Sequence, residues 1–204
     1  MKVEEVLPQG LTAILESPEF DDEAGIVIDA VRFLDNDLLL DFSFRYWNDE
    51  TSPQRWQLTA VGYKEEKIVR DRTQDIALYS QHPLLLEYTD TYTELYFKGT
   101  TTQGEELFID IYQSLLTITE DIGNLGEYVL TPGRVMELSQ QGYGLFAEGS
   151  KTILMLYQLS LTKYGIHAYF VGGREQSEED STLKLFQLGS SYIIGRNFTF
   201  ERLH

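Results

Sequence analysis

The chain of 204 residues contains no cysteine and only three histidines. The absence of cysteine excludes a disulfide framework, a thiolate nucleophile and a thiolate metal ligand. His82, His167 and His204 are widely spaced, so none can form the i, i+4 pair that is typical of a zinc site on a helix. We therefore predict no metal, no cofactor and no histidine-based catalytic site.

Long hydrophobic runs are also absent. No uninterrupted apolar stretch approaches the ~20 residues that a helix needs to span a bilayer. The first residues, from Met1 to Glu5, lack the apolar run of a signal peptide. These features predict a cytoplasmic protein with no membrane partner.

Basic residues are scarce, with 16 Lys and Arg against 33 Asp and Glu and a formal net charge of −17. The densest basic group (Lys64, Lys67, Arg70, Arg72) is interrupted by three acidic residues. Nucleic-acid binding depends on Lys and Arg neutralising phosphates, so the composition predicts no nucleic-acid partner. The carboxylates are spread along the whole chain, which argues against a mimic of nucleic acid. The oligomeric state stays open.

Alternating apolar residues are the clearest pattern that is present. Leu38, Leu40, Phe42, Phe44 and Tyr46 occupy every second position, a period typical of a strand with one face in a core. Short polar segments separate this strand from its neighbours. The segment before it, Asp35-Asn36-Asp37, favours a tight turn. The pattern predicts an antiparallel meander of three strands, at residues 25–34, 38–47 and 54–63.

Further strands are expected after the meander. One includes Ile68 and Val69, and a hairpin pairs residues 84–88 with 92–98. A strand at 166–171 precedes an exposed loop at 175–181. A closing hairpin pairs residues 183–188 with 192–194, and Phe198 and Phe200 extend the sheet.

Three helices are predicted in the second half. The first begins at Gly104, where apolar residues start to recur at three- and four-residue spacing, and Gly123 can end it. The second runs from a Thr131 cap to Gly142. Residues 150–164 alternate partly as a strand does, but Ser150 and Gly165 would cap a helix, and we predict a helix.

These elements predict an α+β fold, a predominantly antiparallel sheet with an N-terminal meander and about three helices packed against it. Residues 1–24 form an acidic N-terminal arm with a short apolar anchor at Leu11, Ile14 and Leu15. The sequence leaves open whether this arm packs against the body or is disordered. Residues 25–204 form a single domain, with lobes 25–100 and 101–204 as the alternative division.

Motifs for chemistry are weak throughout. The segment from Gly144 to Thr152 resembles a phosphate-binding loop, but Ser150 separates the second glycine from Lys151. We interpret it as a glycine-rich turn that leads into a capped helix. Asp35-Asn36-Asp37 begins like a calcium loop, but Leu39 occupies the next ligand position. We predict no catalytic residues.

An exposed aromatic patch is the remaining candidate. Trp47 shares a strand phase with Arg45, and Trp56 could join them across the following turn. Exposed Trp and Arg are enriched at interaction hot spots, so these three residues are a candidate partner-binding site. The competing interpretation is that another layer covers this face and Trp47 lies in the core.

Two functions follow from these observations. The favoured hypothesis is a non-enzymatic, acidic protein-interaction domain of immunity- or adaptor-like type, for which a basic protein is the complementary partner. The alternative is an enzyme or small-ligand-binding protein that uses carboxylates and tyrosines in a cleft between sheet and helices.

Overall fold

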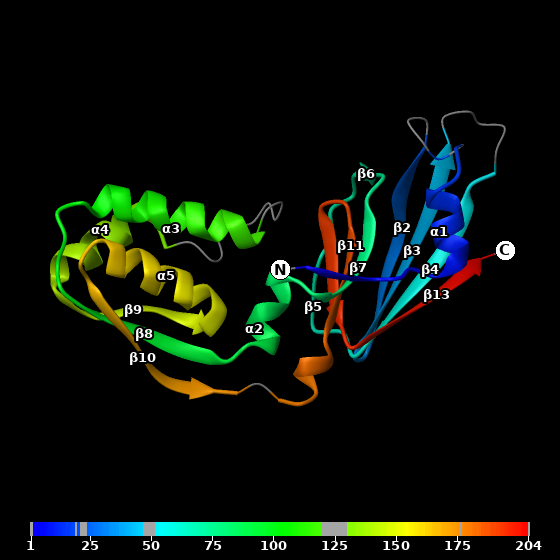
Figure 1. Ribbon diagram of the computed structural model, residues 1–204. Helices are drawn as coiled ribbons and strands as arrows, with labels where there is room; N and C mark the ends of the chain where they lie inside the picture. Colours follow the sequence, from blue (N-terminus) through cyan, green and yellow to red (C-terminus); the bar gives the residue numbers. More distant parts are fainter. Residues whose placement is uncertain are drawn as a thin grey trace. The chain divides into compact units, whose positions relative to one another are not determined.

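The computed structural model describes residues 2–18, 20, 24–46, 52–119, 130–175 and 177–203. Contacts within the chain divide it into two compact units. Unit 1 comprises residues 1–85 and 182–204, and unit 2 comprises residues 86–181 (Figure 1). The alternative lobes predicted from the sequence, 25–100 and 101–204, have their boundary at residue 100. They also assign residues 182–204 to the second lobe, whereas these residues belong to unit 1.

Unit 1 contains two antiparallel five-stranded sheets. The first sheet has the order β1-β7-β11-β12-β5, with strands Val3–Glu5, Ile76–Gln81, Lys184–Leu188, Ser191–Gly195 and Glu65–Lys67. The second has the order β13-β4-β3-β2-β6, with strands Asn197–Leu203, Gln54–Val61, Asp37–Tyr46, Ala24–Leu34 and Arg72–Thr73. The predicted meander is therefore present as β2, β3 and β4, within a larger sheet.

The core of unit 1 lies between these sheets. Phe186 of β11 is buried at its centre, with its ring 6.5 Å from that of Phe42 in β3 and 6.1 Å from that of Phe198 in β13. Alternation along β3 explains this placement, because its even-numbered apolar residues all point to one side. The pattern that predicted the strand thus supplies half of the interface between the sheets.

Helix α1, Gln9–Leu15, packs on the same core. Leu11 and Ile14 are buried, as predicted for the apolar anchor of the N-terminal arm. Gly10 permits the close approach of the helix to β4, since a Cβ atom there would lie 3.0 Å from Cη2 of Trp56. The described part of the arm is therefore an integral part of unit 1.

One strand prediction in unit 1 is wrong. The strand expected at Ile68 and Val69 lies earlier, as β5, and ends at Lys67. The Ser191 hydroxyl binds both polar groups of the Val69 backbone, accepting from its N–H at 2.8 Å and donating to its carbonyl at 3.0 Å, in place of a strand ladder. Phe198 and Phe200 extend a sheet, as predicted, since β13 pairs with β4 at the edge of the second sheet.

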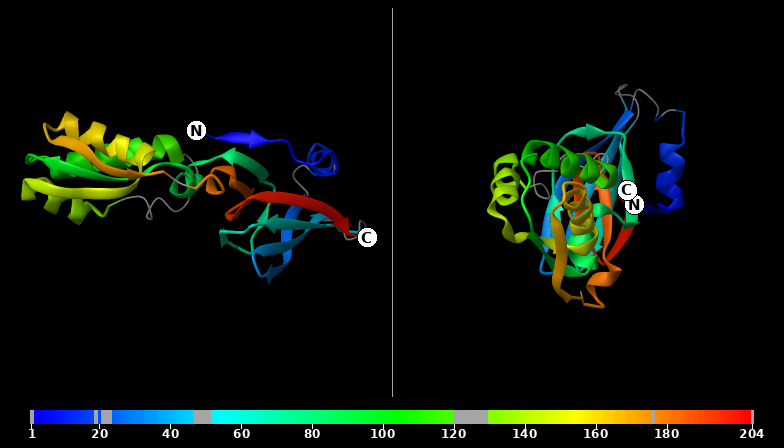
Figure 2. Two further views of the ribbon diagram at one scale, coloured as in Figure 1. Left: turned by 90° about the horizontal axis from the view of Figure 1, so that it is seen from below. Right: turned by 60° about the vertical axis from the view of Figure 1, so that its left-hand side comes forward.

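Unit 2 contains one three-stranded antiparallel sheet with the order β10-β8-β9. The strands are β8 (Tyr92–Lys98), β9 (Tyr143–Ser150) and β10 (His167–Arg174). The helices are α2 (Leu86–Thr89), α3 (Gly104–Thr119), α4 (Pro132–Gln141) and α5 (Lys151–Lys163). Figure 1 shows α3, α4 and α5 on one side of the strands, and Figure 2 (left) shows the three strands side by side.

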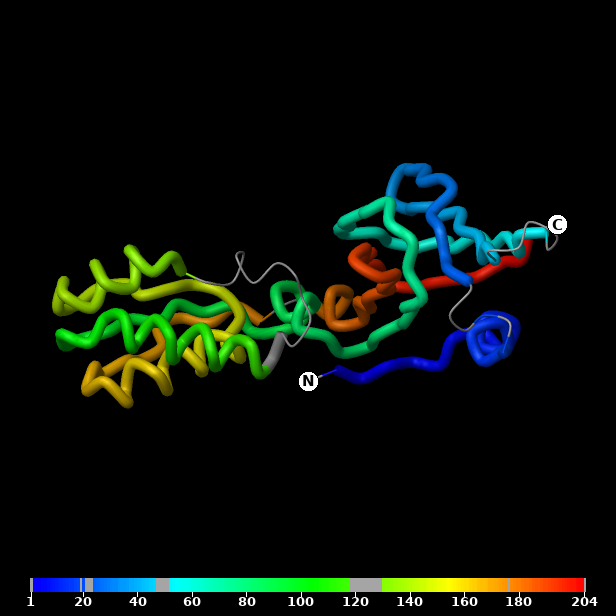
Figure 3. The backbone as a smooth tube through the Cα atoms, turned by 90° about the horizontal axis from the view of Figure 1, so that it is seen from above, coloured from blue at the N-terminus to red at the C-terminus, as the bar shows by residue number. Residues whose placement is uncertain are grey.

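The helices cover one face of this sheet. Helix α5 contacts all three strands, and α4 contacts β9. Helix α3 packs on both α4 and α5, and Figure 3 shows the three helices seen from above. The side chains between them form a second core, centred on Leu95, Phe97, Ile111 and Leu161, which are almost completely buried.

The predicted helix caps are confirmed where the structure describes them. The Thr131 hydroxyl accepts the Arg134 N–H at 3.3 Å, and Gly142 ends α4 in the left-handed region with φ of 89°. Ser150 caps α5, so the helical interpretation of 150–164 is confirmed over Lys151–Lys163. Gly123, the predicted end of the first helix, lies outside the described residues.

The predicted strand at residues 84–88 is wrong, since the chain forms a 3₁₀ turn at Pro83–Leu85 followed by α2. Pro83 favours a helical start because its ring fixes φ and its missing N–H needs no partner there. Nδ1 of His82 accepts the Leu84 N–H at 3.2 Å and stabilises the turn. Leu84 and Leu85 are nevertheless buried, so their apolar character belongs to packing rather than to a ladder.

The fold class is mixed helix and antiparallel sheet, as predicted. The count of about three helices is too low: the described residues form five α-helices, two of them, α1 and α2, short. One predominant sheet is replaced by three sheets in the two units.

Candidate functional site

Arg45 and Trp56, the two described residues of the predicted aromatic patch, lie on opposite faces of the second sheet of unit 1. Arg45 is exposed on β3, where Nη2 lies 2.7 Å from Oδ1 of Asp29 and Nε donates to the Ser43 hydroxyl at 3.1 Å. Trp56 is only 6 % exposed and belongs to the core of unit 1. Strand register pairs Trp56 with Phe42, which places it on the opposite face of the sheet from Arg45.

Trp47 lies outside the described residues. The partner-binding role of Arg45 and Trp47 therefore stays a prediction. Burial of Trp56 removes that side chain from any surface patch, because the indole lies against Gly10 of α1. The sequence could not show this, since the helix that covers Trp56 comes from the N-terminal arm.

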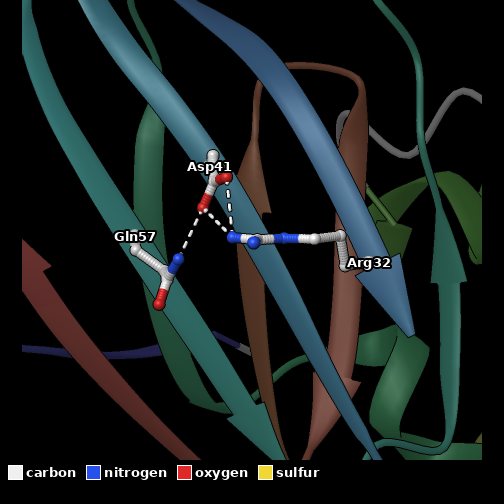
Figure 4. A network of polar contacts seen from close by, with 3 residues as sticks. All are labelled: Arg32, Asp41 and Gln57. Atoms are coloured by element: carbon white, nitrogen blue, oxygen red, sulfur yellow. Dashed lines mark hydrogen bonds and ion pairs between the residues drawn. The ribbon is translucent and has the colours of Figure 1, made fainter. Parts of the chain in front are cut away.

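The polar face of the second sheet forms its own network. Nη2 of Arg32 lies 3.0 Å and 2.8 Å from the two carboxylate oxygens of Asp41, and the Gln57 amide donates to Asp41 at 2.8 Å (Figure 4). The three side chains come from β2, β3 and β4, three adjacent strands. Their donors and acceptors satisfy one another, which is typical of a solvated sheet surface rather than of a binding site.

A pocket of about 500 Å³ lies in unit 2 beside β9. This volume falls within the range of small-molecule sites. β9 is an edge strand of the sheet, and the pocket lies where this edge meets the first turns of α4 and α5. Its walls come from four segments that are distant in the sequence, at residues 87–92, 130–134, 145–150 and 153–157.

One wall of the pocket is apolar. It is formed by Leu130, Phe146, Ile153, Leu154 and Tyr157. The ring of Phe146 meets that of Tyr157 edge-on at 6.0 Å, which fixes both side chains. Burial raises the pKa of Tyr157 to about 12, although a hydrogen bond with the Leu130 backbone opposes the shift. The Tyr157 hydroxyl therefore stays uncharged at neutral pH.

The rest of the lining is polar and predominantly acidic. Glu87 of α2 and Glu148 of β9 contribute carboxylates, and Tyr92 contributes a hydroxyl. Partial burial and the nearby Glu148 charge raise the pKa of Tyr92. Arg134 also lines the pocket, but its Nη1 lies 2.8 Å from Oε2 of Glu137. The carboxylates therefore dominate the charge of the lining.

The N-terminus of α5 is held beside the pocket by Asp90. Its Oδ2 accepts the Ser150 hydroxyl at 2.5 Å and the Thr152 N–H at 2.7 Å. Burial would raise the pKa of Asp90, but these hydrogen bonds outweigh it and lower the pKa. A carboxylate thus occupies the helix end where a phosphate loop would place a phosphate.

The interpretation of residues 144–149 as a turn is wrong. They belong to β9, which pairs with β8 and continues directly into α5. Gly149 has φ of 146°, a conformation that favours glycine at the end of the strand. The expected capped helix is confirmed, and the lysine that resembled a phosphate ligand is the first residue of α5.

Sequence reasoning did not find Glu87, Tyr92 or Glu148 as members of one site. They are separated by up to 61 positions, and only strand pairing brings them together. The available signal was the register of β8 and β9, in which Tyr92 pairs with Ser150 and Glu94 with Glu148. This register cannot be derived before the strand at 143–150 is recognised.

Three further comparisons bear on function. In the described part of the chain, no helix is both long enough and apolar enough to cross a membrane. Among the same residues, His, Asp and Glu do not gather in groups of three that could hold a metal ion. No model of a known protein family matches this chain, and neither curated proteins nor solved structures give a match.

Proposed function

We propose that unit 2 binds a small organic cation that has an apolar body, in the pocket beside β9. The observation that carries this proposal is the pocket itself, whose lining combines apolar side chains with the carboxylates of Glu87 and Glu148. A cavity of this size with few polar groups is the usual form of a ligand site. This proposal corresponds to the small-ligand alternative from the sequence, and it assigns binding without a reaction.

Charge supports a cation. The sequence of unit 2 contains 15 acidic and 5 basic residues, a formal net charge of −10. Such a field raises the local concentration of cations and speeds their association. Within the pocket, a carboxylate can accept a charge-assisted hydrogen bond from an ammonium or guanidinium group.

The apolar wall supports a body larger than a simple ion. The side chains of Phe146, Ile153 and Leu154 gain no free energy from a hydrated metal or ammonium ion, but they gain it from an alkyl or aryl group that displaces water. The expected ligands are therefore alkyl or aryl amines and guanidines.

Titration calorimetry of the full chain with a panel of such compounds tests the proposal. The panel pairs each amine with the carboxylate that has the same apolar body, for example phenethylamine with phenylpropionate. We expect the amines to bind, and Glu148→Gln and Glu87→Gln to weaken that binding at least about tenfold. Glu105→Gln is the matched control, because it removes the same charge from unit 2 outside the pocket.

The control separates a local site from a general charge effect. Equal weakening by all three variants would contradict a site at β9, since the net charge alone would then govern binding. Absence of binding by every amine, or tighter binding of the paired carboxylates, would overturn the proposal.

A further inference from the structure

The sheet of unit 2 has a second face, opposite the helices, which we call the open face. Its side chains alternate with those of the helix-covered core along β8, and the register of β9 and β10 with β8 places their side chains on the same face, with one irregularity in each pairing. It is formed by Glu94, Tyr96 and Lys98 of β8, Tyr143, Leu145 and Glu148 of β9, and His167, Tyr169 and Val171 of β10.

Large apolar side chains are unusually exposed on this face. Tyr143 is 73 % exposed and Tyr169 is 42 % exposed. The rings of Tyr96 and Tyr169 stack with their centroids 6.2 Å apart, which presents a flat aromatic platform at the middle of the sheet. A contiguous exposed patch of this kind marks an interaction surface more often than a solvated one.

Charge on the open face is ordered in rows across the strands. Lys98 lies beside His167 and Tyr143 in the first row, Tyr96 lies in the middle row, and Glu94 lies beside Glu148 in the third. Beyond that row, Arg174 pairs with Tyr92 and lies over its ring. Four residues along a strand separate Lys98 from Glu94 by roughly 13 Å, too far for an ion pair between them. Among the described residues none forms an ion pair with Lys98.

We propose that the open face binds the open face of a second copy of this chain. A two-fold axis that crosses the strands at the row of Tyr96 places Lys98 of one copy over Glu94 of the other, and the reverse. The same operation stacks the two aromatic rows on each other. A two-fold axis along the strands would instead place Lys98 over Lys98, so the charges select the first arrangement.

The charges of the open face complement each other, and this favours a second copy of the chain as the partner. A uniformly basic partner would suit Glu94 but would oppose Lys98, whereas a second copy satisfies both ends of the face. Three strands and about six residues span roughly 15 by 20 Å, so two such faces bury about 600 Å² in total, less than the ~1,000 Å² expected of a stable interface. We expect a weak dimer that forms reversibly with concentration.

The open face and the ligand pocket share Leu145 and Glu148 of β9. Lys98 and Glu94 do not line the pocket themselves, but Glu94 pairs with Glu148, so Lys98→Glu is the variant that leaves the proposed ligand contacts in place. Measurements belong at about 0.15 M salt, where a Debye length of about 8 Å screens the net repulsion of two acidic chains while contacts at the interface persist.

Sedimentation equilibrium of the full chain between about 5 and 500 μM tests the proposal through a charge exchange. We expect the native chain to dimerise within this range. Lys98→Glu and Glu94→Lys should each weaken dimerisation at least about tenfold, because each places like charges opposite each other twice. The double variant should restore it to within about threefold, since the pair re-forms with its signs exchanged.

The restored double variant is the decisive result, because the two positions are too far apart to interact within one copy. Circular dichroism of each variant at low concentration checks that the sheet is intact. A native chain that remains monomeric at all concentrations, single variants that dimerise normally, or a double variant that is no better than the singles would each overturn the proposal.

Discussion

Unit 1 and unit 2 treat the apolar faces of their sheets differently. In unit 1 two five-stranded sheets and α1 cover each other, so that apolar side chains are turned inward from both sides. In unit 2 a three-stranded sheet is covered by helices on one face only, and tyrosines occupy the other. Strands with alternating apolar residues therefore occur in two settings. In unit 1 the face away from the core is polar, whereas in unit 2 it carries tyrosines.

The polar side chains of the two units differ in the same way. On the second sheet of unit 1, Arg32 and Arg45 each lie against an aspartate, so the surface satisfies its own charges. On the open face of unit 2, Lys98 and Glu94 lie four residues apart along β8. A surface that neutralises itself needs no partner, whereas a surface with separated charges suits a complementary one.

The largest expected effect distinguishes a covered aromatic residue from an open one. Trp56→Ala should lower the unfolding free energy of unit 1 by about 3–5 kcal/mol, because it leaves a cavity under α1. Tyr143→Ala, on the open face, should cost less than about 1 kcal/mol at a concentration where the chain is monomeric. Urea unfolding monitored by circular dichroism measures both, and equal costs would contradict the contrast between the units.

The second prediction concerns a buried histidine of unit 1. Burial, together with the positive charge of Lys2, lowers the pKa of His82 to about 4. In the described structure its Nε2 has no hydrogen-bond partner, and its Nδ1 accepts a backbone N–H. The unfolded chain binds a proton near pH 6.5 and the folded chain near pH 4, so stability is full above about 6.5 and falls as the pH drops.

We expect roughly 2–3 kcal/mol of pH-dependent stability from this residue between pH 6.5 and 4. His82→Asn keeps an acceptor near the Leu84 N–H and cannot titrate, so its stability should depend less on pH in this range. Unfolding free energies of both proteins at matched pH values measure the difference. Parallel pH profiles would show that His82 is accessible to protons in the folded state.

The smallest predicted effect concerns the cap of α5 in unit 2. Asp90→Ala removes an acceptor from the Ser150 hydroxyl and the Thr152 N–H, and should cost about 1 kcal/mol at pH 7. Because hydrogen bonds lower the pKa of Asp90, its contribution is present above about pH 4 and is lost as the carboxylate becomes protonated below it. Asp110→Ala, which breaks an exposed pair with Lys163, is the matched control. A cost at pH 7 no larger than that of the control would show that the cap is weak.

Local sequence signals predicted those elements whose stability is itself local. Thr131, Ser150 and Gly142 bind or end their own helices, so α4 and α5 could be located from a few adjacent residues. The hairpin of β2 and β3 could be located because the Asx turn is encoded at its tip, where Asp35 has φ of 48°. None of these elements depends on a distant partner for its type.

Non-local pairing explains the failures. The apolar residues at 84–88 fit a strand and a short buried helix equally well. The turn at Pro83 makes this segment helical. The pocket assembles from four separated segments, and Trp56 is buried by a helix from the N-terminal arm. No short-range pattern contains this information.

The sequence by itself determined an acidic, cysteine-free chain of mixed helix and antiparallel sheet, since charge, composition and the periods of 2 and 3.6 residues are properties of the chain alone. Only the tertiary structure decided how the strands divide among three sheets, which face of each is covered, and which side chains line a pocket. The physical reason is that strand partners and packing surfaces are chosen by burial across long separations, where many arrangements satisfy the same local pattern.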